Sequence, residues 1–317
     1  MKAYAQKRPE SFGYNHHQIT FQNDTVHILS RSKKGEDQIK KPVLLFIQGS
    51  KAKPLLIYND ETFLYPSPLE NNIEDDYHLV MVNKPGIPLM AHQDSLGKGR
   101  QFIDKVTGKV PTTHTVHNNL EYYVERNNKV IEYLMKQQWV DTTKIIVAGH
   151  SEGSSIAVHL AAKNTSVTHL IYSGGTPYYP RILAMVRQER DKEMDSANVW
   201  VERSFSYWED VLDHPFDTSR SHGWNSYKGT YSFSQNENEI IKRLKIPVLI
   251  TYGTKDEAAP FNDMFRIETM KDRKDHITFK AYIGLEHNFF GLHTDGSIDY
   301  NQFNWDKVVK DWFAWLN

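Results

Sequence analysis

The 317-residue sequence contains no cysteine. This absence excludes disulfide frameworks, thiolate nucleophiles and zinc sites built from cysteine. Long apolar stretches are also lacking, since no run approaches the roughly 20 residues that a membrane-spanning helix requires. We therefore expect neither covalent cross-links nor a part embedded in a membrane.

Excess charge of either sign is missing as well. The chain carries 38 Lys and Arg against 39 Asp and Glu, so its formal net charge is −1. Such a chain has no net field to attract a phosphate backbone or an anionic membrane surface, and neither is an expected partner. Residues 1–8 lack the apolar core of a signal peptide. The location is therefore cytoplasmic by default, or the protein is exported and its signal is absent from this sequence; the oligomeric state stays open.

Short apolar runs that end in small or turn-forming residues alternate with helical patterns along the chain. This alternation predicts the α/β class, with a mostly parallel twisted sheet and helices on both faces. Loops at the carboxyl ends of such strands usually carry ligands and catalysis. The expected strands are residues 42–47, 79–82, 145–148, 169–172, 248–252 and 277–283, with antiparallel edge strands over 19–31; the expected helices are 119–138, 151–163 and 303–316.

Residues 176–238 interrupt the alternation, because they contain no clear strand pattern and many aromatic side chains. We interpret them as a helical, aromatic-rich lid or cap insertion, since long insertions are usually functional. Residues 1–175 and 239–317 then form the core of the fold. Ordinary connecting helices with a long loop remain an alternative.

The segment Gly149-His150-Ser151-Glu152-Gly153 matches the pattern G-x-S-x-G of a nucleophile elbow. A strand pattern precedes it and a helical pattern follows it, as this motif requires. Side chains at the two glycine positions would collide with the neighbouring strand and helix. The turn exposes the serine Oγ, and the helix N-terminus favours negative charge that develops near it. The sequence therefore predicts Ser151 as a nucleophile.

A serine nucleophile needs a base, and the base needs an acid that orients it. In this kind of fold the chain order is nucleophile, acid, histidine. Asp256 follows the strand 248–252 directly and is the expected acid. Glu257 and Asp263 are alternatives that lie further from the end of the strand.

The base should follow the next strand, 277–283. His287 comes directly after that strand and is the expected base. His293 is the close competitor. His276 precedes the strand and would lie at the wrong edge of the sheet.

An oxyanion hole needs two aimed backbone N–H groups. Glu152 should supply one, because it follows the nucleophile. The loop after the strand 42–47 should supply the other, with Ser50 preferred and Gly49 or Lys51 as alternatives.

With these residues, the chain resembles the α/β-hydrolase superfamily, especially its bacterial esterase, dienelactone-hydrolase-like and prolyl-oligopeptidase-like members. The resemblance implies Ser151, Asp256 and His287 as the triad, Ser50 and Glu152 as oxyanion donors, and no metal or organic cofactor. Gln48 departs from the family, since many members have His there. The motifs that carry the resemblance are residues 48–50, 83–86, 141–153, 253–260 and 286–287.

The expected function is a serine hydrolase that cleaves a carboxylic ester or lactone, a small molecule, through an acyl-enzyme intermediate. A peptidase or amidase, a thioesterase, and a non-catalytic ligand-binding protein of the same fold are the alternatives. We expect substrate contacts from the neighbours of the nucleophile and from the aromatic insertion. These predicted contact residues are Gln48, His150, Trp200, Trp208 and Trp224.

Overall fold

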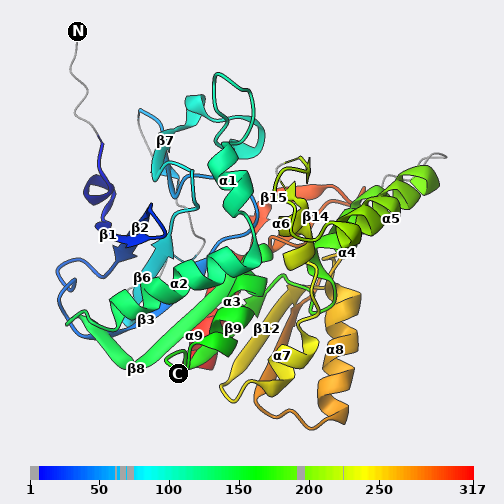
Figure 1. Ribbon diagram of the computed structural model, residues 1–317. Coiled ribbons are helices and arrows are strands. Elements are labelled where there is room, and N and C mark those ends of the chain that lie inside the picture. Colours follow the sequence, from blue (N-terminus) through cyan, green and yellow to red (C-terminus); the bar gives the residue numbers. More distant parts are fainter. Residues whose placement is uncertain (1–6, 61–62, 65–68, 70–74, 191–196, 224) are drawn as a thin grey trace.

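A twisted eight-stranded sheet runs through the computed structural model, which describes residues 7–60, 63–64, 69, 75–190, 197–223 and 225–317 (Figure 1). The strand order is β1-β2-β6-β3-β8-β9-β12-β13. These strands are β1 (Asn15–Phe21), β2 (Asp24–Arg31), β6 (His78–Val82), β3 (Lys41–Ile47), β8 (Val140–His150), β9 (His169–Ser173), β12 (Val248–Gly253) and β13 (Ile277–Tyr282).

Strands β6 to β13 of this order are parallel to one another. Strands β1 and β2 form a hairpin that joins β6 in antiparallel orientation. Gln22 and Asn23 connect them at φ 46° and 64°, as a two-residue hairpin turn requires. The predicted α/β class and the antiparallel N-terminal edge are confirmed.

Helices cover both faces of the sheet. Successive residues of β3 alternate between two apolar clusters: Val43 and Leu45 face one cluster, and Leu44 and Phe46 face the other. This double burial explains the continuous apolar runs in the sequence. The first face packs against α2 (Leu120–Leu134), α3 (Glu152–Lys163), α7 (Asn238–Arg243) and α8 (Ala259–Lys271), and the second against α9 (Trp305–Leu316).

Several short elements were not predicted. In the described ranges they form a three-stranded sheet, a hairpin near the C-terminus, 3-10 helices and the short helix α1 (Thr112–His117). None of the helices in the described ranges is long and apolar enough to cross a membrane. The short elements are β4 (Leu56–Tyr58), β5 (Phe63–Leu64), β7 (Met90–His92), β14 (Phe290–Leu292), β15 (Ile298–Phe303), η1 (Pro9–Phe12), η3 (Gln93–Ser95) and η4 (Lys98–Arg100).

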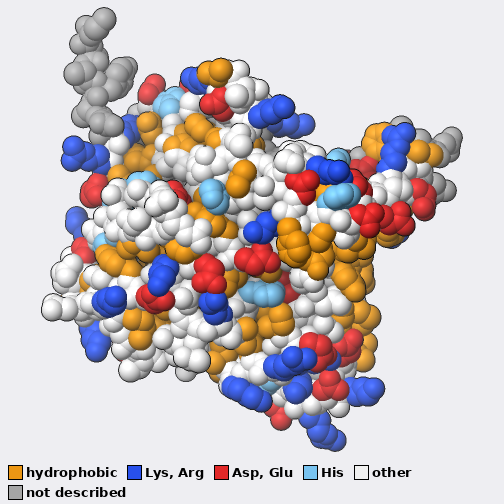
Figure 2. All heavy atoms as spheres, in the orientation of Figure 1, with side chains coloured by type: hydrophobic (Ala, Val, Ile, Leu, Met, Phe, Trp, Pro, Cys, Tyr) orange, Lys and Arg blue, Asp and Glu red, His pale blue; other side chains and the backbone are white. Residues whose placement is uncertain are grey.

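The 176–238 segment contains α4 (Pro180–Arg190), α5 (Ala197–Asp213), β10 (Ser221–His222), β11 (Asn225–Ser226) and α6 (Tyr227–Ser232). Helices α4 and α5 pack together and project to one side of the molecule (Figure 1). They share a small apolar cluster of their own, separate from the two that flank the sheet. Basic and acidic side chains are interspersed over the visible face, which agrees with the balanced charge of the chain (Figure 2).

Candidate active site

Ser151 forms a sharp turn between β8 and α3. Its backbone has φ 59° and ψ −128°, which is unusual for a residue with a side chain and costs about 1–3 kcal/mol. Three hydrogen bonds hold this turn. The Ser151 N–H donates to the Ser173 carbonyl at 2.9 Å, and the Ser151 carbonyl accepts from the Ser154 N–H at 2.9 Å and from the Ser154 hydroxyl at 2.6 Å.

Two glycines make room for the turn. A Cβ atom on Gly149 would lie 2.0 Å from the Gly153 carbonyl oxygen, and one on Gly153 would lie 2.1 Å from the Ile47 carbonyl oxygen. Both contacts are with backbone, which cannot rotate away. The spacing of the G-x-S-x-G pattern thus follows from the close approach of β3, β8 and α3.

We expect Gly153→Ala to lower the free energy of unfolding by about 3 kcal/mol, because the new methyl group must displace the backbone of β3. Urea denaturation of the variant measures this effect. Gly35→Ala is the matched control, since Gly35 has φ +83° with open space around it and should cost only about 1 kcal/mol. Equal losses in the two variants would contradict the steric explanation.

Asp256 and His287 form a hydrogen-bonded pair, with 2.8 Å between His287 Nδ1 and Asp256 Oδ2. Burial alone would raise the pKa of Asp256, but the charge and hydrogen bond of His287 and the N–H of Ala258 together lower it. Burial would likewise lower the pKa of His287, but the charge and hydrogen bond of Asp256, with smaller contributions from the charges of Glu286 and Glu257, raise it. The pair therefore stabilises a protonated imidazole beside a charged carboxylate.

The alternative residues from the sequence have other surroundings. Glu257 forms an ion pair with Arg187 at 3.7 Å, and Asp263 accepts a hydrogen bond from a tyrosine hydroxyl of β12 at 2.5 Å. His293 Nε2 lies 3.8 Å from an oxygen of Asp299. Only the last of these contacts joins a histidine to a carboxylate, and it belongs to the hairpin of β14 and β15.

The loops after β8, β12 and β13 meet at one edge of the sheet, because these strands are parallel and close in the strand order. Gly174 follows β9 between them, at φ +58°, and a Cβ there would lie 3.4 Å from the His287 ring. Ser151, Asp256 and His287 all line one cavity of about 1010 Å³. The structure thus brings the three predicted residues together.

The loop after β3 passes beside the serine. A Cβ on Gly49 would lie 3.2 Å from Ser151 Cβ and 3.6 Å from Ser151 Oγ. Ser50 and Glu152 line the same cavity. Within the part of the chain that the structure describes, neither the Ser50 N–H nor the Glu152 N–H donates a hydrogen bond. Both N–H groups therefore stay candidates for the predicted oxyanion hole.

The predicted substrate contacts have different positions. Trp200, on α5, lines the cavity. Gln48 lines a separate cavity of about 20 Å³, with its Nε2 3.5 Å from the Val82 carbonyl oxygen. Trp208 packs against the apolar cluster of α4 and α5 and stacks on Tyr231. Trp224 lies outside the described residues.

His150 is buried behind the nucleophile rather than exposed in the cavity. Its ring packs against Phe289 and Trp305, and its Nδ1 lies 3.1 Å from the Ser173 hydroxyl. Burial lowers its pKa to about 3, so it is neutral. Its ring also lies 5.0 Å from the His287 ring, so His150 packs against the predicted base. Within the described ranges, no group of three or more His, Asp or Glu side chains is arranged to hold a metal ion.

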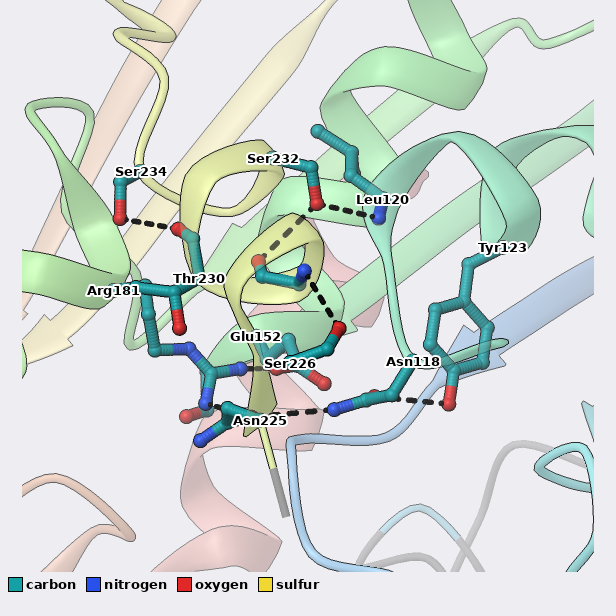
Figure 3. A network of polar contacts seen from close by, with 12 residues as sticks. Asn118, Leu120, Tyr123, Glu152, Arg181, Asn225, Ser226, Thr230, Ser232 and Ser234 are labelled. Carbon is teal, nitrogen blue, oxygen red and sulfur yellow. Dashed lines mark hydrogen bonds and ion pairs between the residues drawn. The ribbon is translucent and has the colours of Figure 1, made fainter. Parts of the chain in front are cut away.

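A buried group of charged residues next to the nucleophile was missed by the sequence analysis. The Glu152 carboxylate contacts the Arg181 guanidinium and lies 3.5 Å from Lys84 Nζ. Arg181 also donates to Asn225 Oδ1 at 2.9 Å (Figure 3). These residues come from distant parts of the chain. Their segments were each noted in the sequence, but no pattern in the sequence indicated that these side chains would meet.

A family model described as the alpha/beta hydrolase fold matches residues 117–291, more than half of the chain. The chain belongs to the α/β-hydrolase family. This membership supports a hydrolase as the general class of activity. No curated protein matches the chain.

Solved structures show the same fold in other α/β hydrolases. Est1E from Butyrivibrio proteoclasticus is 15% identical with a TM-score of 0.54, over 93% of this chain and 95% of that one. A 2,6-dihydroxy-pseudo-oxynicotine hydrolase is 14% identical with a TM-score of 0.52, and the match covers 86% of this chain and 62% of that one. The Pyrococcus horikoshii acylaminoacyl peptidase is 13% identical with a TM-score of 0.53, over 86% of this chain and 37% of that one. The chain therefore spans less than two thirds of the length of two of these proteins, and at these identities the similarity concerns the fold alone.

Proposed function

We propose that this α/β hydrolase is a serine hydrolase that cleaves carboxylic esters or lactones through an acyl-enzyme intermediate. One observation carries the proposal. Ser151, on a strained turn, lines the same cavity as His287, whose Nδ1 lies 2.8 Å from the buried carboxylate of Asp256. A nucleophile, a base and an orienting acid are the groups that this chemistry needs.

The mechanism follows from these positions. Asp256 accepts the Nδ1 proton of His287, so Nε2 carries the lone pair that removes the proton of the Ser151 hydroxyl. The serine oxygen attacks the acyl carbonyl, and the N–H groups of Ser50 and Glu152 stabilise the oxyanion. His287 then protonates the leaving alcohol. Water, activated by the same imidazole, hydrolyses the acyl-enzyme and releases the acid.

We further propose that the 176–238 segment is a lid over the substrate. The cavity of about 1010 Å³ lies between this segment and the loops of the sheet, and it is larger than a small acyl group needs. Its aromatic lining favours a partly apolar substrate. Trp200 and Tyr207 of α5, and Phe233, supply this aromatic surface.

A fluorophosphonate probe tests the class of activity. Stoichiometric labelling of Ser151, found by mass spectrometry of the digested protein, is the expected result. No labelling of the correctly folded protein would favour a non-catalytic ligand-binding protein.

A matched panel in which one acyl group is presented as ester, thioester and amide separates the remaining candidates. We expect the ester to give the highest kcat/KM, and a preference for the amide would indicate a peptidase or amidase.

The pH dependence of kcat/KM for a neutral ester reports the base of the free enzyme. His287 must be neutral to accept a proton, and Asp256 raises its pKa above the ordinary value of 6.5. Activity is therefore expected to fall as the pH decreases through an apparent pKa above 6.5, and to reach a plateau on the alkaline side. A profile of kcat/KM against pH at constant ionic strength measures this fall on the acidic side. An apparent pKa below 6.5 would contradict the role of Asp256.

A further inference from the structure

The carboxylate of Glu152 belongs to a closed ring of polar contacts, and Figure 3 shows the part of it that runs from Glu152 through Arg181 and the asparagines to Tyr123. Starting from Arg181, the ring runs through two asparagines and a tyrosine to Lys84, and returns to Glu152. The contacts are Arg181 Nη1 to Asn225 Oδ1 (2.9 Å), Asn118 Nδ2 to Asn225 Oδ1 (3.2 Å), Tyr123 OH to Asn118 Oδ1 (3.3 Å), Lys84 Nζ above the Tyr123 ring (5.4 Å) and Lys84 Nζ to Glu152 Oε1 (3.5 Å).

This ring connects the 176–238 segment to the nucleophile elbow. Glu152 is the residue after Ser151 and the first residue of α3, whereas Arg181 is the second residue of α4. Arg181 is fixed within the 176–238 segment, because its N–H donates to the Phe233 carbonyl at 3.0 Å and its guanidinium lies 5.4 Å from the Phe233 ring. A shift of α4 would therefore pull on the Glu152 side chain.

The Glu152 carboxylate depends on its cationic partners. Its side chain is 4% exposed, and a buried carboxylate is costly unless nearby charges compensate it. Burial and the charge of Arg181 lower the pKa of Lys84 to about 7, so Lys84 loses its charge as the pH rises past neutrality. Arg181 is then the partner that keeps Glu152 compensated at neutral and alkaline pH.

We propose that Arg181 is a positioning residue for the oxyanion hole. By holding the Glu152 carboxylate, it fixes the peptide N–H of the same residue beside Ser151, and it makes this donor depend on the placement of the 176–238 segment. The inference rests on the proposed serine-hydrolase function, in which the Glu152 N–H binds the oxyanion.

Arg181 also lines the cavity, so a direct contact with an anionic substrate is the competing role. The two roles predict different kinetics. A substrate contact made throughout the reaction changes KM, whereas a donor needed in the transition state changes kcat.

The test compares Arg181→Gln, Glu152→Gln, the double variant and Arg181→Lys on a neutral ester. We expect Arg181→Gln to lower kcat by about 30-fold, less than the 10²–10³-fold that loss of an oxyanion donor costs, with KM changed less than about twofold. The double variant should recover part of this loss, because it no longer buries an uncompensated carboxylate. Lys163→Gln on α3 is the control, since Lys163 forms an exposed ion pair with Glu125 and kcat should not change.

The pH profile adds a readout that a purely structural role would not move. In Arg181→Gln, Lys84 remains as the cationic partner of Glu152 among the described residues, so kcat should fall at alkaline pH as Lys84 deprotonates. The wild type should not show this fall of kcat at alkaline pH. Removing the Arg181 charge raises the pKa of Lys84, so the fall of kcat in Arg181→Gln should occur above neutral pH.

An unchanged kcat in Arg181→Gln, or a rise in KM that the double variant does not reverse, would overturn the inference. If Arg181→Gln does not fold, the double variant decides, because it removes the contact without burying an uncompensated carboxylate. A lower kcat at unchanged KM supports the inference, and an unchanged kcat overturns it. A wild type that neither hydrolyses esters nor reacts with a fluorophosphonate contradicts the proposed function itself. An active wild type with an equally active Arg181→Gln contradicts only the positioning role.

Discussion

Replacement of Ser151 by alanine should lower kcat for ester hydrolysis by a factor on the order of 10⁶ and leave the fold intact. Alanine keeps the Cβ atom and the backbone conformation, so the turn at φ 59° is no more strained than before. Only the hydroxyl is lost, and the bonds that hold the elbow in the described part of the chain use backbone atoms of Ser151.

Steady-state kinetics and fluorophosphonate labelling measure the effect, and urea denaturation checks that stability is unchanged. Ser297→Ala is the matched control, because Ser297 is exposed and its hydroxyl donates to Asp295 of its own turn. Undiminished hydrolysis by the Ser151 variant, or labelling at another residue, would contradict the assignment of the nucleophile.

Replacement of Asp256 by asparagine should lower kcat by about 10⁴-fold. The amide has nearly the shape of the carboxylate but no charge, so it no longer stabilises the imidazolium that forms during attack. It can also present an N–H₂ group to Nδ1, which selects the wrong tautomer of His287. The charge of Asp256 is the main influence that raises the pKa of His287 against burial, and its loss should move the acid limb of the rate profile to lower pH.

Asp263→Asn is the control for this variant. Asp263 is the alternative acid further along the chain, and its contact is with the Tyr252 hydroxyl at 2.5 Å. Its replacement should change kcat by less than a few-fold. A larger loss of kcat in Asp263→Asn than in Asp256→Asn would reverse the assignment of the acid.

Several features of the site could be predicted because they are local in the chain. The elbow needs only five consecutive residues with a strand before them and a helix after them, and the apolar runs of the parallel strands mark both. Asp256 and His287 follow from strand order, since parallel strands present their carboxyl ends at one edge of the sheet. The structure brings these residues together, and their roles stay predictions until the variants are measured.

The aromatic residues of 176–238 were harder to interpret. Many of them pack on one another, as Trp208 does on Tyr231 and Tyr207 does on Tyr227, while Trp200 faces the cavity. Composition alone does not separate these two uses, because both require large apolar side chains. The direction of each ring depends on how α5 and α6 pack together.

The sequence by itself determined the fold class, the elbow and the order of the predicted triad, because periodicity and chain order encode them. Only the tertiary structure decided where Gln48 and His150 point, and that Glu152 contacts Arg181 and Lys84. These two contacts with Glu152 join residues about 30 and about 70 positions apart. No local pattern specifies a partner at that separation, so the ring beside Ser151 appears only when the 176–238 segment is folded onto the sheet.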